Sequence, residues 1–160
     1  MNDDLRTLYR LVRRTRAGVL DWLDDLPSGV VTTVHPDFAF GSLAAIYSHI
    51  ADCYLRWVEN IGLGRERRSG VQAADVAALR RAFGEVDAIV DEALGTFTDL
   101  DEPMPWTFEN GWKEVLSRRW LIVHPITHEF HHKGQALALA RVLGHPHHGS
   151  PDTDLVLPGG

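Results

Sequence analysis

The stretch DDLRTLYRLVRRTRAGVLDWLDDL, residues 3–26, decides the fold class because its apolar residues recur at steps of three and four. Side chains at these steps share one face of an α-helix, so we predict an amphipathic helix here. Pro27 and Gly29 follow directly and end the helix. The residues of the stripe predicted to be buried are Leu5, Leu8, Leu11, Val12, Thr15, Val19, Trp22, Leu23 and Leu26.

Two further segments have the same period and are also predicted to be helices. Ser42 is a favourable N-cap because its hydroxyl can accept a hydrogen bond from a free N–H of the first turn, and the helix that follows it ends at Gly62. A third helix lies within residues 72–97. Proline and glycine in the connections 28–41 and 99–111 prevent continuous helix, so both connections are predicted to be irregular.

The fourth helical pattern runs from about Trp112 to Leu143. Pro125 lies inside this pattern and has no N–H to donate to the carbonyl of Leu121. We therefore expect the last helix to be kinked or split near Pro125. Gly144 is the predicted C-terminal stop.

Residues 145–160, HPHHGSPDTDLVLPGG, are rich in proline and glycine and are predicted to form an extended tail that lies on the helices. No internal repeat is present, and no run with a strand period is long enough to predict a sheet. Four helices joined by connections of mixed length predict an all-α fold. We expect a four-helix bundle that forms one domain over residues 1–160.

The composition narrows the classes of protein and of partner. Hydrophobic residues make up 44% of the 160 residues, which is enough for a buried core, and the formal net charge of −6 argues against a nucleic-acid partner. No stretch approaches the roughly 20 apolar residues that a membrane span needs, and the N-terminus does not resemble a signal peptide. The single cysteine, Cys53, cannot form an internal disulfide. We therefore expect a cytoplasmic protein that binds neither membrane nor nucleic acid.

Histidines gather in the segment THEFHHKGQ, residues 127–135. His128 and His132 are four residues apart and share a helix face, where two imidazoles can grip one metal ion, and His131 is a rival for the second place. A pair alone binds weakly, so a third ligand has to come from elsewhere in the chain. His49 is the best candidate because it lies in the middle of a largely apolar helix, where an unsatisfied imidazole would be costly.

Three imidazoles with an open fourth position would form a metal site of the catalytic type rather than a closed structural one. Zinc suits this ligand set, and nickel, iron or cobalt would also accept it. The residues alone leave an alternative open. In that alternative His49 is a half-buried, hydrogen-bonded histidine, and the pair on the fourth helix lies on a surface that holds no metal.

Other candidates for chemistry are weaker. Cys53 is either a small hydrophobic residue of the core or a side chain that faces the metal cavity as an extra ligand. His145, His147 and His148 are expected to be solvated, because a proline-interrupted tail gives them no fixed geometry. We do not assign residues 128–132 to the H-E-x-x-H motif of zinc metalloproteases.

The segment WLIVHPITHEFHHKGQALALARVLGHPHHGSPDTDLVLP, residues 120–158, resembles the DinB family of damage-inducible, YfiT-like metal-binding proteins. In that family a histidine, three residues, a second histidine, a basic residue, Gly and Gln follow one another in the last long helix, and another histidine lies in the middle of the second helix. The matching residues here are His49, His128, His132, Lys133, Gly134 and Gln135. Lysine at position 133, where arginine is common, should alter a surface contact more than the metal site.

The resemblance implies a four-helix bundle in up-down-down-up order, a metal site formed by His49, His128 and His132, and a homodimer. Relatives of this fold include thiol S-transferases that use bacillithiol and the mycothiol-dependent maleylpyruvate isomerase. In these the metal would bind a low-molecular-weight thiol and lower its pKa. Two functions follow as hypotheses. One is a metal-dependent enzyme acting on a small-molecule substrate, either a thiol S-transferase or a hydrolase that uses metal-bound water. The other is a non-catalytic metal-binding protein linked to stress.

Two residues are candidates for orienting the metal-binding histidines. Gln135 lies three residues after His132, and its amide can accept the free ring N–H that a ligating histidine usually donates. Glu129 is the competing acceptor. Gln135 could instead form a hydrogen bond across the bundle and only hold the helices in register.

Overall fold

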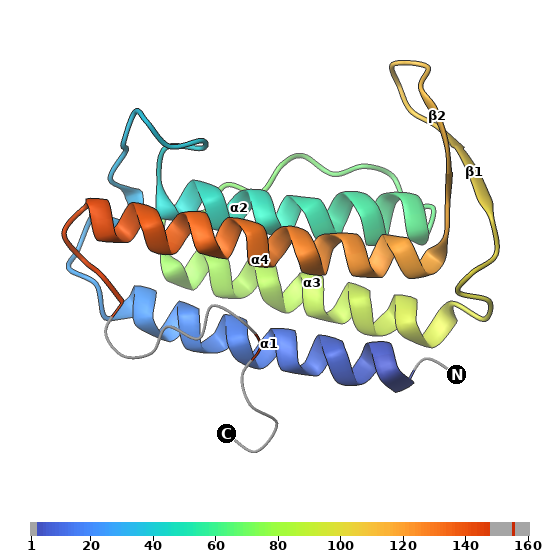
Figure 1. Ribbon diagram of the computed structural model, residues 1–160, viewed down its shortest axis with the longest axis horizontal. Coiled ribbons are helices and arrows are strands. Elements are labelled where there is room, and N and C mark those ends of the chain that lie inside the picture. The colour runs from blue at the N-terminus through green and yellow to red at the C-terminus, as the bar shows by residue number, and fades with distance from the viewer. Residues whose placement is uncertain (1–2, 148–154, 156–160) are drawn as a thin grey trace.

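The computed structural model describes residues 3–147 and residue 155, and long helices lying side by side make up most of this part (Figure 1). This mostly helical architecture is compatible with the predicted four-helix bundle. The four α-helices of the described part are α1 (Asp3–Asp24), α2 (Leu43–Tyr54), α3 (Val76–Thr96) and α4 (Arg118–Val142). A short 3₁₀-helix, η1 (Val30–Thr32), lies in the first connection.

The directions of the helices explain the long connection between α2 and α3. In Figure 1, α1 and α4 run from right to left, whereas α2 and α3 run from left to right. Because α2 and α3 share a direction, residues 63–75 must return along the length of the molecule before α3 begins. α2 packs against both α3 and α4, and α1 packs against α3.

The second helix begins as predicted and changes geometry before it ends. The Ser42 hydroxyl accepts a hydrogen bond from the N–H of Ala45 at 3.2 Å, which confirms the predicted N-cap. After Tyr54 the helix continues as a π-helix, η2 (Leu55–Gly62). Its last turn closes with a bond from the Leu63 N–H to the Val58 carbonyl, 2.9 Å long and five residues back. Such wide turns occur mostly at functional sites, and this one lies beside the candidate site described below.

A small hairpin precedes α4, and the predictions of no sheet and of a helix from about Trp112 were wrong. Strand β1 (Met104–Thr107) pairs antiparallel with β2 (Lys113–Leu116), with Met104 opposite Leu116 and Thr107 opposite Lys113. Gly111, with φ of +83°, supplies the left-handed turn residue that a side chain would resist. The helix then begins after Ser117, whose hydroxyl accepts from the N–H of Trp120. The strands were missed because each is only four residues long.

Pro125 lies inside α4 and is buried. The helix is continuous from Arg118 to Val142, so of the two predicted outcomes the split is excluded, and the kink near Pro125 stays a prediction. Gly144, with φ of +87°, follows the end of α4 as predicted.

The core lies between the helices and contains several aromatic side chains. Its largest side chains that are less than 2% exposed are Tyr9, Tyr47, Tyr54, Leu23, Leu43, Ile46, Ile50, Leu79, Leu121, Ile122, Leu139 and Val12. A second, smaller cluster of Ile61, Leu116 and Leu121 joins the hairpin to η2 and α4. The hairpin is therefore packed onto the helices.

Only part of the predicted tail can be compared with the structure. Leu155 packs against the core beside Leu8 and Phe130. The rest of the DTDLVLP segment and His148 lie outside the described residues. His145 and His147 are half-buried, and the ring of His147 contacts Trp22 at a centroid distance of 5.1 Å, so the prediction that these two are solvated was wrong.

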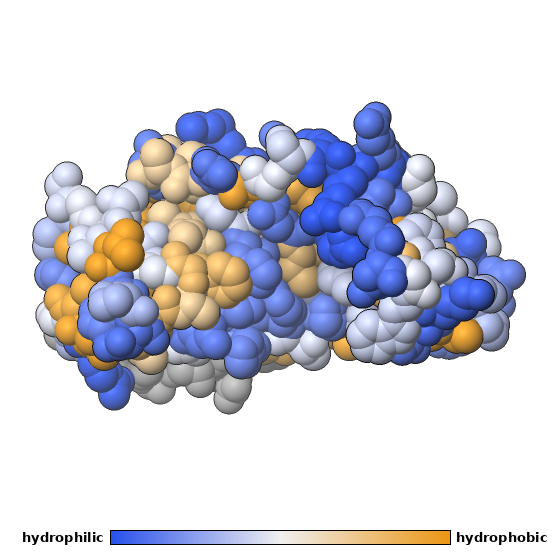
Figure 2. All heavy atoms as spheres, turned by 90° about the horizontal axis from the view of Figure 1, so that it is seen from above, coloured by the Kyte–Doolittle hydropathy of each residue, from blue (hydrophilic) through white to orange (hydrophobic). Residues whose placement is uncertain are grey.

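The surface above α2 is uneven in character. Figure 2, which views the molecule from above, shows hydrophobic residues gathered toward the left and strongly hydrophilic residues right of centre. The left end is the one at which the connection 28–41 lies, and Val34 and Phe40 in that connection are exposed hydrophobic residues. Within the described residues, no helix is both long enough and apolar enough to cross a membrane.

Candidate metal centre

Packing of α2 against α4 brings three histidines together at the middle of both helices. His49 comes from α2, and His128 and His132 come from successive turns of α4. The Nε2 atom of His128 lies 3.3 Å from that of His49 and 3.2 Å from that of His132. One ring nitrogen from each histidine lies within 4.8 Å of the other two, so the three could hold one metal ion.

The separation of these nitrogens fits metal ligands. Histidine nitrogens about 2.0–2.1 Å from a tetrahedral ion lie about 3.3–3.4 Å from one another, close to the two Nε2 separations observed here. The donor set of three imidazoles suits zinc and other first-row divalent ions. A tetrahedral ion held in this way keeps one corner open for water or substrate.

The protonation of the three rings also suits metal binding. Burial lowers the pKa of His49 and of His132 below the usual value. Burial and the charges of neighbouring histidines lower the pKa of His128 to about 4. An imidazole must be neutral to ligate a metal, so at neutral pH the rings are in the form that the ion requires.

Gln135 orients His132. The Nδ1 atom of His132 lies 2.7 Å from Oε1 of Gln135, and because an amide oxygen can only accept, Nδ1 carries the proton. The lone pair of Nε2 then faces His128. The amide nitrogen of Gln135 donates to Nε2 of His131 at 3.1 Å. His131 is exposed and lies next to the site but is not in the three-histidine group. Of the two candidate acceptors, Gln135 and not Glu129 accepts the ring N–H of His132.

Phe40 closes one side of the centre, and the sequence analysis missed it. Its ring stacks on His49 at a centroid distance of 4.1 Å and meets His132 edge-on at 5.5 Å. Phe40 has a φ of +67°, a conformation that is unusual for a residue with a side chain. Residues held in this region cluster at functional sites. No local pattern in the connection 28–41 indicates this conformation.

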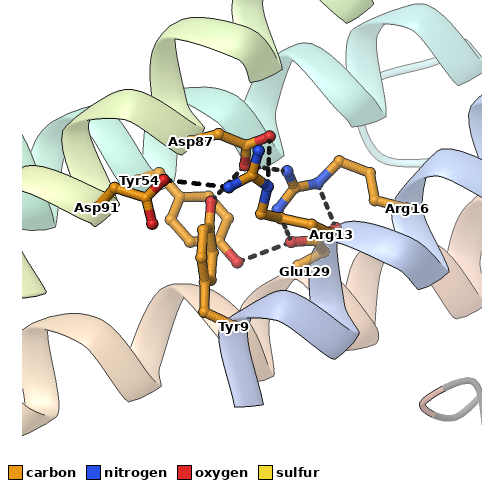
Figure 3. A network of polar contacts seen from close by, with 7 residues as sticks. All are labelled: Tyr9, Arg13, Arg16, Tyr54, Asp87, Asp91 and Glu129. Atoms are coloured by element: carbon orange, nitrogen blue, oxygen red, sulfur yellow. Dashed lines mark hydrogen bonds and ion pairs between the residues drawn. The ribbon is translucent and has the colours of Figure 1, made fainter. Parts of the chain in front are cut away.

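Glu129 is fully engaged away from the histidines (Figure 3). Its carboxylate accepts hydrogen bonds from Nε and Nη2 of Arg16, at 2.8 and 2.9 Å, and from the hydroxyl of Tyr54 at 2.7 Å. Residues 128–132, His-Glu-Phe-His-His, do match the H-E-x-x-H motif, so the prediction that this motif is not present was wrong. The structure nevertheless excludes the metalloprotease role of the glutamate, because this carboxylate is occupied by Arg16 and cannot act as a general base.

The Arg16–Glu129 pair belongs to a network that joins all four helices beside the centre. Arg16 of α1 also contacts Asp87 of α3 at 2.8 Å, and Asp87 accepts from the Tyr9 hydroxyl at 2.7 Å. Figure 3 shows these side chains converging from the four helices on one point. Glu129 follows His128 directly, so the network fixes the rotation of α4 about its axis and points its histidines toward His49.

A cavity of about 270 Å³ opens beside the histidines, with His49, His128, Arg56, Arg67 and Gly70 in its wall. Cys53 also lines this cavity. It is not in the three-histidine group, and burial raises the pKa of its thiol to about 12. In the metal-free protein the Cys53 thiol is therefore protonated at neutral pH and is not a free thiolate nucleophile.

Two comparisons with known proteins bear on the chain. A search of curated proteins gives no match. A model of the DinB family matches residues 1–156, almost the whole sequence, including all three histidines of the centre. The chain therefore belongs to the DinB family.

Proposed function

We propose that this protein is a metal-dependent enzyme that holds one divalent cation through His49, His128 and His132. Zinc is the first candidate, and nickel, iron and cobalt are the alternatives. The observation that carries the proposal is the convergence of three neutral imidazole nitrogens, within 4.8 Å of one another, beside a cavity of about 270 Å³. We propose a four-helix bundle in up-down-down-up order as the scaffold, and the helix directions in Figure 1 support it.

Transfer of a low-molecular-weight thiol to a small molecule is the reaction that the site supports best. A bound divalent cation lowers the pKa of a thiol or water that it ligates and so supplies a nucleophile at neutral pH. The chain contributes the shape and charge around that position. Phe40 covers the histidines on one side, so the cavity is the approach for the thiol.

Hydrolysis by metal-bound water is the second enzymatic candidate. It usually requires a carboxylate or histidine as general base next to the water. Glu129, the carboxylate in the sequence position for this role, is held by Arg16 and Tyr54. Asp52 also lines the cavity, and its carboxylate accepts a hydrogen bond from the N–H of Val71 at 2.6 Å. Because both carboxylates are engaged by other groups, the geometry favours thiol transfer over hydrolysis. It also favours either reaction over a non-catalytic stress protein, because a cavity reaches the histidines.

The experiment that tests this function begins with metal analysis of protein purified without a histidine tag. The metal-loaded protein is then assayed for S-transfer with bacillithiol, mycothiol and glutathione against a panel of small electrophiles. We expect one ion per chain, and transfer that requires both the ion and one of the thiols. One bound ion without transfer by any thiol, and with hydrolysis of an ester panel instead, would replace the transferase with the hydrolase.

Truncating Gln135 should weaken the metal site without removing a ligand. Gln135→Ala leaves the Nδ1 proton of His132 without an acceptor, and loss of such a partner typically costs about 10–100-fold in metal affinity. The measurement is a competitive titration with a chromophoric chelator. His131→Ala is the matched control, because it removes the other amide contact of Gln135 and leaves the His132 contact in place. Equal affinities for the two variants would contradict an orienting role of Gln135.

We also propose that the protein is a homodimer in solution. Large hydrophobic side chains remain exposed on the single chain, notably Val34 and Val142. Burial of such residues against a second copy would remove apolar area from water. Sedimentation at micromolar concentration should therefore give a mass of twice the 17.9 kDa chain, and a single species of 17.9 kDa would contradict the dimer.

A further inference from the structure

A second and larger cavity lies between the hairpin, η2 and the start of α4. Its volume is about 870 Å³, within the range of about 300–1,000 Å³ that is typical of small-molecule sites. The aromatic residues of its wall are Trp57, Phe108, Trp112 and Trp120. Trp112 is 62% exposed and Trp120 is 38% exposed. Large aromatic side chains kept at the surface of a cavity mark a binding site.

The aromatic rings are arranged to hold a planar molecule. Trp57 meets Trp120 at a centroid distance of 4.8 Å and an angle of 82°, and it meets Phe108 at 6.0 Å and 78°. These edge-to-face contacts fix the rings of Trp57 and its neighbours relative to one another. A flat aromatic ligand can stack on one ring and contact the edge of the next at the distances that aromatic pairs prefer.

The aromatic cavity adjoins the metal centre. Trp57 and Arg56 line both this cavity and the smaller one that contains His49 and His128. A continuous layer of rings makes the same connection within α4. Trp120 stacks on His124 at 4.4 Å with an angle of 10°, and His124 lies 5.7 Å from His128. A molecule in the aromatic cavity therefore lies one layer of side chains from the candidate ligands.

Arg56 supplies a positive charge at the junction of the two cavities. It is half-buried, and in the part of the chain that the structure describes it has no carboxylate partner. The other arginines in the wall of the smaller cavity differ in this respect. Arg67 contacts Glu109, and Arg68 contacts Glu59 and Glu85. The guanidinium of Arg56 lies over the Trp57 ring, 5.8 Å from its centroid, and its N–H groups can form a bidentate pair with a carboxylate of a ligand.

The opposite wall of the aromatic cavity carries carboxylates. Glu109 and Glu114 belong to the hairpin, and Asp101 precedes it. Asp101 is held by Arg119 and Glu109 by Arg67, so two of the three are already neutralised. Glu114 is the one carboxylate of the three with no ion pair among the described residues, so its charge disfavours an anionic group at the hairpin and favours placing that group toward Arg56, at the side shared with the metal cavity.

We infer that this aromatic cavity is the site for the acceptor substrate, a small planar aromatic molecule with a carboxylate that pairs with Arg56. The role of this ligand as the acceptor substrate rests on the proposed function, whereas binding of the ligand itself requires no metal. The Trp57, Phe108, Trp112 and Trp120 side chains hold the ring system, and Arg56 sets its orientation relative to His128. A second copy of the chain covering Trp112 is the competing occupant of this surface.

Calorimetric titration with two probes of nearly the same shape tests the inference. The probes are 2-naphthoate and its neutral counterpart 2-naphthalenemethanol, each titrated into the metal-free and the metal-loaded protein. We expect naphthoate to bind about 10–100-fold more tightly than the alcohol, the range set by a charge-assisted hydrogen-bonded pair. Arg56→Gln should abolish this preference, and Trp120→Leu should lower the affinity for both probes.

Arg80→Gln is the matched control. Arg80 pairs with Asp21 and Asp24 and does not line the aromatic cavity. The control variant should leave both affinities unchanged, and circular dichroism checks that every variant is folded. Equal binding of the two probes, or a preference that survives Arg56→Gln, would overturn the inference. Binding that disappears as the chain self-associates would assign the surface to a second copy instead. A failure of S-transfer with intact naphthoate binding would overturn the proposed reaction but not this site.

Discussion

Arg16→Met is expected to lower the free energy of unfolding by about 3–5 kcal/mol, the usual cost of removing one partner of a buried ion pair. The side chains of Arg16 and Glu129 are 2% and 5% exposed, so the variant would leave the Glu129 carboxylate buried with only the Tyr54 hydroxyl as a partner. Domains of this size are stable by about 5–15 kcal/mol in total, so the loss would be a large fraction. Equilibrium denaturation of the metal-free protein measures it.

Arg13→Met is the control for this prediction. Arg13 lies on the same helix and pairs with Asp91 and Asp87, but its own side chain is 43% exposed and Asp87 keeps Arg16 as a partner, so its loss should cost less than about 1 kcal/mol. The double variant Arg16→Met, Glu129→Met provides a further test, because replacing a whole buried pair with apolar residues is often neutral. It should be more stable than Arg16→Met alone. Similar losses for Arg13→Met and Arg16→Met would show that the pair is not a buried determinant of stability.

Alanine at any one of His49, His128 and His132 is expected to abolish stoichiometric metal binding. Each substitution leaves two imidazoles, and a two-histidine site lacks the third protein ligand that sites with an open position require. Elemental analysis after gel filtration measures the ion per chain. The folded state of each variant is checked by thermal unfolding in the absence of metal.

His124→Ala and His131→Ala are the matched controls for the ligand variants. His124 lies one turn before His128 on α4, and His131 contacts Gln135, but neither belongs to the three-histidine group. Both should retain one ion per chain. A His49→Ala protein that binds metal as well as the parent would show that the third ligand comes from another residue.

Several features of this protein were determined by local sequence. The amphipathic period of residues 3–26 forms α1, the Ser42 hydroxyl caps α2, and Gly144 follows the end of α4. The spacing of His128 and His132 also placed both on one face of a helix. These features were predictable because each depends on residues within one or two turns of one another, so helical geometry alone relates them.

The two short strands and the start of the last helix could not be predicted from local sequence, because they depend on contacts within the whole fold. Strands β1 and β2 have four residues each, too few for a period to be recognised, and they are stabilised by each other and by the cluster of Ile61, Leu116 and Leu121. The predicted helix from Trp112 began too early because the strand is short. Over so few residues, the spacing of apolar residues in a strand can also be produced by a helix.

The site was decided partly by sequence and partly by tertiary structure. The sequence placed His128, His132 and Gln135 on one helix and made His49 the candidate third ligand, but His49 lies 79 residues from His128 and Arg16 lies 113 residues from Glu129. No local pattern reports such distances. Only the packing of α2 on α4 brings His49 to the pair, only α1 brings Arg16 to Glu129, and only the path of the first connection places Phe40 on the rings. The physical reason is that side-chain identity and local geometry are properties of a segment, whereas the distance between two segments is set by how their buried faces pack.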